Sequence, residues 1–150
     1  MGCDINAILQ HKEKNVWVDK KIVNIDRNYG FFSVLAGVRG SFKPISQPRG
    51  LPKDFIMHET KTGQFDRCFP NPNEYTRSLH PTPLCTEDNG YQQGYIFIGD
   101  HSHSYLTLHE INKYNWAKIK ENVFVDDEFR DLFLYCRNLR NWRLVFGFDS

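Results

Sequence analysis

The stretch Ile5-Asn6-Ala7-Ile8-Leu9, followed by Val16-Trp17-Val18, decides the fold of this chain. Alternate residues of the first run are apolar, which is the spacing of one face of a β-strand. The second run has the same strand character, and Lys12 to Asn15 between them predicts the turn of a hairpin. The fold is therefore expected to begin with a pair of antiparallel strands.

Further strands are expected at Lys21 to Ile25, at Tyr95 to Ile98 and at Arg143 to Phe148. A helix is expected around Phe31 to Val38, because its apolar residues recur at helical spacing. Asn28 suits the N-cap of this helix.

Gly40 suits the C-terminal cap of the same helix. Thr107 and Glu110 fit a capping box that starts a second helix, running to about Tyr114. A third helix is expected from Asp126 to Arg140, with acidic residues in its first turn and basic ones in its last.

All seven prolines fall between residues 41 and 94, which predicts a long, mostly irregular insertion. A chain of 150 residues is expected to form a single domain over residues 1–150. The order of elements predicts an α+β fold, with a mainly antiparallel sheet, about three helices on one face, and the proline-rich loop as an insertion.

The composition limits the kind of partner. Hydrophobic residues make up 40% and the net charge is only +1, so disorder and duplex nucleic-acid binding are disfavoured. No apolar stretch approaches the roughly 20 residues that span a bilayer, so no membrane partner is expected. The four cysteines form no Cys-x-x-Cys pair, which favours reduced thiols in an intracellular protein.

The segment Gly99 to Tyr105 concentrates polar chemistry, with Asp100, His101, His103 and Ser104 close together in the chain. Histidine is the side chain whose charge changes near neutral pH, so this segment is a candidate site. One interpretation makes His101 and His103 a catalytic acid and base, or donors to a ligand. The alternative is a polar loop that caps the following helix.

A divalent metal is an alternative for this segment, because His-x-His pairs chelate, with Asp4, Cys3 or Asp100 as a third ligand. We do not favour it, and no cofactor is predicted.

A second group of candidates carries positive charge. Arg27, Arg39 and Arg49 each lie at a loop or helix end, where a guanidinium can bind a phosphate in bidentate fashion. Tyr29 is suited to stacking on a base, and Asp4 to holding a hydroxyl or orienting an imidazole. The alternative is a set of ordinary surface residues.

Several motifs together resemble a family of small, largely uncharacterised bacteriophage proteins. They follow one another over nearly the whole chain: Gly2-Cys3-Asp4-Ile5, Arg27-Asn28-Tyr29 with Leu35-Ala36-Gly37-Val38-Arg39, Pro48-Arg49-Gly50-Leu51-Pro52, His101-Ser102-His103-Ser104 with Leu106-Thr107-Leu108, and Val145-Phe146-Gly147-Phe148-Asp149. The resemblance implies a phage setting, and hence the cytoplasm of an infected bacterial host. By analogy it points to proteins that capture or destroy nucleotide signals of bacterial immunity.

This chain departs from that family at two positions. Members carry His where this chain has Asn6, and Trp where it has Tyr105. An amide cannot act as a base near pH 7, so the first departure favours binding over catalysis.

Three functions follow as hypotheses. The first is immune evasion by sequestering a phosphorylated, nucleotide-like messenger of the cyclic nucleotide or cyclic ADP-ribose type, with a homo-oligomer deepening the pocket. Its expected ligand-binding residues are Asp4, Arg27, Tyr29, Arg39, Arg49, His101, His103 and Ser104. The second is a phosphodiesterase that uses His101 and His103, and the third is a protein-binding inhibitor of a host factor.

Overall fold

The computed structural model describes residues 2–55, 58–59, 65–69, 94–116 and 127–150. The chain divides into two compact units, one formed by residues 1–52 with 99–150 and the other by residues 53–98. The prediction of one domain over the whole chain stays a prediction. The candidate residues all belong to the first unit.

The first unit opens with the predicted hairpin, formed by β1 (Asp4–Glu13) and β2 (Val16–Val23). Lys14 and Asn15 both have positive φ, as in the two-residue turns that match the twist of a hairpin. The separate strand predicted at Lys21 to Ile25 is wrong, because β2 keeps its pairing with β1 as far as Val23.

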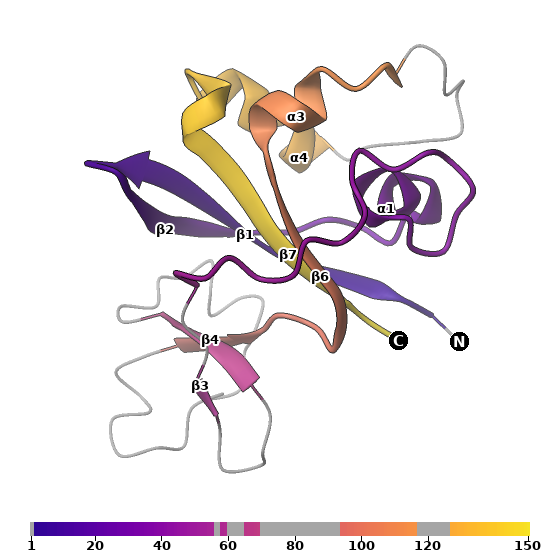
Figure 1. The fold of residues 1–150 in the computed structure, drawn as a ribbon, viewed down its shortest axis with the longest axis horizontal. Helices are drawn as coiled ribbons and strands as arrows, with labels where there is room; N and C mark the ends of the chain where they lie inside the picture. Colours follow the sequence, from indigo (N-terminus) through magenta and orange to yellow (C-terminus); the bar gives the residue numbers. More distant parts are fainter. Residues whose placement is uncertain (1, 56–57, 60–64, 70–93, 117–126) are drawn as a thin grey trace. The chain divides into compact units, whose positions relative to one another are not determined.

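Four strands form an antiparallel sheet in the order β2-β1-β7-β6. The final strand, β7 (Trp142–Asp149), confirms the prediction for the end of the chain and pairs with β1 along its whole length. Its other neighbour is β6 (His101–Thr107), in the polar segment for which no strand was predicted and a loop was the alternative interpretation. Figure 1 shows β1, β7 and β6 crossing the unit side by side.

Helix α1 (Tyr29–Ala36) begins where the sequence predicted, because the Asn28 side chain accepts a hydrogen bond from the Phe31 amide. Its C-terminal cap is Gly37, with φ of 73°, and not Gly40 as expected. Glycine adopts this left-handed conformation without steric cost, so the helix stops three residues earlier.

Helix α3 (Leu108–Asn112) confirms the predicted capping box: the Thr107 hydroxyl accepts from the Glu110 amide, and the Glu110 carboxylate accepts from the Thr107 amide. Helix α4 (Asp127–Tyr135) is shorter than expected, since the chain turns into a 3-10 helix, η3 (Leu139–Asn141). Asn138 has a left-handed conformation, which does not continue an α-helix.

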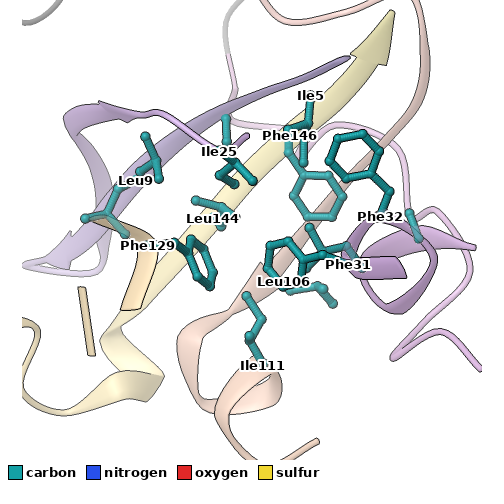
Figure 2. Close-up of a cluster of buried hydrophobic side chains, with 14 of the residues drawn as sticks. Ile5, Leu9, Ile25, Phe31, Phe32, Leu106, Ile111, Phe129, Leu144 and Phe146 are labelled. Atoms are coloured by element: carbon teal, nitrogen blue, oxygen red, sulfur yellow. The ribbon is translucent and has the colours of Figure 1, made fainter. Parts of the chain in front are cut away.

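The core lies between one face of the sheet and the helices α1, α3 and α4. Figure 2 shows the labelled side chains pointing toward one another from β1, β6 and β7, from the helices, and from the segment between β2 and α1. The members that the figure labels are Ile5, Leu9, Ile25, Phe31, Phe32, Leu106, Ile111, Phe129, Leu144 and Phe146. The prediction of an α+β fold with helices over an antiparallel sheet is therefore confirmed.

The second unit contains a sheet of three strands in the order β3-β4-β5, formed by β3 (His58–Glu59), β4 (Phe65–Phe69) and β5 (Gly94–Phe97). The strand expected at Tyr95 to Ile98 corresponds to β5. Much of the predicted insertion, including the last four prolines, lies outside the described residues.

Candidate functional site

One end of the four-stranded sheet gathers residues from both ends of the chain. Asp4 at the start of β1 lies opposite Asp149 at the end of β7, and His101 at the start of β6 lies opposite Phe148. Two strand spacings of about 4.8 Å separate β1 from β6, so Asp4 and His101 are about 10 Å apart along the sheet. Figure 1 shows the end of β7 beside the start of β1.

Arg27 reaches this end of the sheet from the segment that precedes α1. Its Nε lies 3.0 Å and its Nη2 2.9 Å from Oδ1 of Asp4. The hydrogen bond that Arg27 donates to this carboxylate raises the pKa of Arg27. About half of each side chain is exposed, 49% for Arg27 and 56% for Asp4, so both remain accessible from solvent.

Tyr29, the first residue of α1, is fixed in the same region. Its hydroxyl accepts a hydrogen bond of 3.2 Å from the Cys3 amide, and its ring packs 5.9 Å from that of Phe32. Arg39 follows α1 in a left-handed conformation, with its guanidinium carbon 5.8 Å from the centre of the Tyr29 ring.

Several of these charged groups influence the pKa of the Cys3 thiol. Burial raises its pKa, and the guanidinium of Arg39 is the next largest influence, lowering it. Asp149, Asp4 and Arg27 act on the same thiol. We call Asp4, Arg27, Tyr29, Arg39 and Asp149 the sheet-end cluster.

His101 lies beside this cluster on the neighbouring strand. Its ring stacks on Phe148, with centroids 6.1 Å apart, and its two nitrogens each lie 3.0 Å from a serine hydroxyl, of Ser102 and Ser150. A neutral imidazole donates through one nitrogen and accepts through the other, so one of the two hydroxyls donates to His101.

A β-bulge at the start of β6 separates the two histidines. His101 pairs with Phe148 and Ser104 with Phe146, so three steps on β6 match two on β7, and Ser102 has a φ of 53°. His101 therefore lies on the helix-covered face with Phe148, whereas His103 shares the opposite face with Tyr105. The ring Nε2 of His103 lies 2.7 Å from the Gly99 carbonyl, to which it donates.

Arg49 and Ser104 belong to a different arrangement. The Arg49 guanidinium binds both carboxylate oxygens of Glu110, at 3.0 and 2.6 Å, and the Tyr105 carbonyl at 3.0 Å. Its amide donates to the buried Ser104 hydroxyl at 3.0 Å. Arg49 is the largest cause of a pKa of about 2 for Glu110. The Arg49 guanidinium is thus bonded to the protein itself.

Asp149 and Ser150 were not among the predicted site residues, and the structure places them beside Asp4 and His101. Asn6, noted only as a departure from the family, donates a hydrogen bond of 3.0 Å to Asp149. The signal that identifies these residues is strand pairing: an antiparallel first and last strand place the two ends of the chain together.

A cavity of about 500 Å³ lies elsewhere in this unit, between the end of α3 and α4. Its walls are largely apolar and include Ile111, Trp116, Phe129, Phe133 and Leu134. None of the predicted ligand-binding residues lines it.

Comparison of the chain with family models, with curated proteins and with solved structures found no match. Within the described ranges, no three His, Cys, Asp or Glu side chains are grouped to hold a metal ion. No helix in that part of the chain has the length and apolar character needed to cross a bilayer.

Proposed function

We propose that this protein binds a small phosphorylated, nucleotide-like ligand at the sheet-end cluster. The observation that carries the proposal is the meeting of Arg27 and Arg39 around Tyr29. Two accessible guanidiniums beside a half-buried phenol ring match the chemistry of a ligand that combines phosphate with a planar base.

The ion pair between Arg27 and Asp4 does not prevent phosphate binding. An exposed pair of this kind contributes little to stability, so the phosphate oxygens of a ligand can compete with the carboxylate for Arg27. Asp4 then remains available to accept from a hydroxyl group of the ligand.

His101 lies at the same end of the sheet, on the helix-covered face with Phe148, whereas Asp4 and Asp149 are one residue out of step with that face. Its hydroxyl partners, Ser102 and Ser150, give this edge further hydrogen-bonding groups for the polar part of a ligand. Arg49 and Ser104 are left out of the proposed site, because their hydrogen-bonding groups are bonded within the protein.

Capture is favoured over hydrolysis. A phosphodiesterase that uses His101 and His103 as acid and base needs both rings beside the same phosphate, and the bulge turns them to opposite faces. Asn6, at the position where the phage family carries His, is bonded to Asp149 and cannot serve as a base.

The resemblance to bacteriophage proteins supplies the biological setting of the proposal. In an infected bacterium, a protein that holds such a ligand without cleaving it lowers the free concentration of an immune messenger. The proposed function is therefore sequestration of a cyclic nucleotide or cyclic ADP-ribose type of signal in the host cytoplasm.

The test is to incubate the protein with a panel of cyclic dinucleotides and cyclic ADP-ribose isomers, remove unbound compound, and release the bound fraction by heat. We expect intact compound in the released fraction. The double variant Arg27→Gln/Arg39→Gln should weaken binding at least about tenfold, since each charge-assisted bond contributes roughly 1.5–3 kcal/mol.

Arg140→Gln is the matched control, because it removes an exposed arginine outside the cluster and should leave capture unchanged. Recovery of cleaved product contradicts capture, and absence of binding by every compound contradicts the proposal as a whole.

A further inference from the structure

The opposite end of the first unit carries a surface that the proposed function does not use. Four large hydrophobic side chains are exposed in the described part of the chain: Leu134 at 84%, Tyr135 at 72%, Val16 at 60% and Val18 at 36%. They lie on two elements far apart in sequence, the hairpin strand β2 and helix α4.

Two aromatic rings join these side chains into one surface. Val18 lies opposite His11 in the hairpin, and the His11 ring packs 4.2 Å from that of Trp142. Trp142 in turn meets Tyr135 edge to face at 6.0 Å, and Leu134 is the neighbour of Tyr135. We name Val16, Val18, Leu134 and Tyr135, with His11 and Trp142 between them, the hairpin–α4 surface.

Basic groups surround this surface. Lys21 lies on β2 opposite Leu9 in the hairpin, and its charge lowers the pKa of the Cys136 thiol after α4, which burial raises to about 11. Arg137 is exposed, and its carbonyl accepts a hydrogen bond of 3.0 Å from Trp142 Nε1. Arg140 is exposed in the same turn. Within the described residues, Lys21, Arg137 and Arg140 form no salt bridge.

The nearby acids do not cancel this charge. Glu13 is bound by Lys20 at 2.6 Å and contacts His11 at 2.9 Å, so its charge is already matched. Asp131, one turn before Tyr135 on α4, is a further carboxylate on that helix, and it is a single charge against the three cations. A second copy of this chain would bring two basic rims together, which disfavours self-association here.

The edge of the sheet indicates what kind of molecule fits. Within the described residues, β2 pairs only with β1, so the outer backbone groups of Val16 to Val18 face away from the sheet. Such an edge bonds to another polypeptide strand, whereas a lipid surface supplies no matching row of donors and acceptors. The register shift at Lys20 interrupts the edge, so the paired segment must be short.

We propose that the hairpin–α4 surface binds a protein segment that combines acidic and apolar residues. The apolar residues cover Val16, Val18, Leu134 and Tyr135, and the acidic ones meet Lys21, Arg137 and Arg140. Along β1 this surface lies about 30 Å from the sheet-end cluster, so the two sites are separate and a phosphorylated ligand does not compete with the segment.

The experiment is selection of a random peptide-display library on the full chain, with a parallel selection on the variant Leu134→Ser/Tyr135→Ser. Both side chains are largely exposed, so the variant is expected to keep its fold. We expect the wild-type selection to enrich peptides that carry Asp or Glu with aliphatic or aromatic residues. The affinity of the enriched peptides should fall at least about tenfold for this variant and for Arg137→Glu/Arg140→Glu.

Lys113→Glu is the charge-reversal control, with one reversal at an exposed position at the end of α3, and should leave the affinity unchanged. Enrichment of basic peptides, no enrichment, or an affinity for either surface variant equal to that for the wild type overturns the proposal. So does dimerisation in sedimentation that the Leu134→Ser/Tyr135→Ser variant abolishes, or binding to phosphatidylserine vesicles that the same variant abolishes.

Discussion

At the scale of single residues, the same side-chain type serves two different purposes in this protein. Arg27 pairs with the exposed Asp4, and about half of the Arg27 side chain remains in solvent. Arg49 is bonded instead to Glu110, Ser46 and a backbone carbonyl. In the sequence, Arg27 and Arg49 both lie at loop or helix ends and look alike. The partner of Arg49 lies far along the chain, so no local pattern could separate a structural arginine from a ligand-binding one.

The Arg49–Glu110 pair predicts an acid-sensitive contribution to stability. The pKa of Glu110 falls from 4.5 to about 2 in the folded protein, so the unfolded chain takes up a proton first as pH falls. The stabilisation is present above pH 4.5 and is lost on acidification toward pH 2. We expect it to be on the order of 1–3 kcal/mol, because both side chains are partly exposed.

The measurement is the free energy of unfolding of wild type and of Glu110→Gln, obtained by chemical denaturation at several pH values across this range. Glutamine keeps one acceptor oxygen for the capping box, and it removes both the charge and the acceptor of one of the two Arg49 hydrogen bonds. The wild type should lose more stability than the variant on acidification. Glu13→Gln, which removes an exposed carboxylate, should change the pH dependence less. Parallel curves for wild type and Glu110→Gln would refute this account of the pair.

At the scale of elements, the hairpin, α1, the capping box and β7 could be predicted because each depends on nearby residues. Asn28 caps the helix it precedes, and Thr107 and Glu110 are three residues apart. β6 could not be predicted, because its polar sequence lacks strand alternation. Pairing with β7 imposes its extended conformation, and a bulge accommodates the extra residue.

Substituting Gly99, just before β6, should destabilise the protein more than substituting Gly50 does. Gly99 and Gly50 both have positive φ, but only at Gly99 would an added Cβ meet backbone atoms, at 2.6 Å from the Phe148 amide nitrogen. Gly50→Ala should therefore cost about 1 kcal/mol from its conformation alone. Gly99→Ala should cost roughly 2–4 kcal/mol, because the last strand must shift.

Thermal and chemical denaturation of the two variants measure the difference. Equal costs would mean that the close approach of Gly99 to β7 is unimportant for stability.

At the scale of the whole first unit, the topology determines which predicted site residues meet. Pairing of β1 with β7 brings Asp4 to Asp149, and the segment before α1 carries Arg27 to the same end. Asp4, Arg27, Tyr29 and Arg39 therefore gather, with His101 at the same end of the sheet but two strands away from Asp4, while Arg49, His103 and Ser104 lie apart. The sequence supplied these residues as candidates but not their grouping, because strand order depends on contacts between distant segments.

The most direct test of ligand binding at the sheet-end cluster is to titrate the isotopically labelled protein with the same panel of cyclic dinucleotides and cyclic ADP-ribose isomers. The amide chemical shifts are measured by NMR at each step. For the compound that binds, we predict the largest changes at the backbone of Cys3, Asp4, Tyr29, Arg39 and Asp149. Changes confined to the cavity between α3 and α4, or no change with any compound, would contradict ligand binding at the sheet-end cluster.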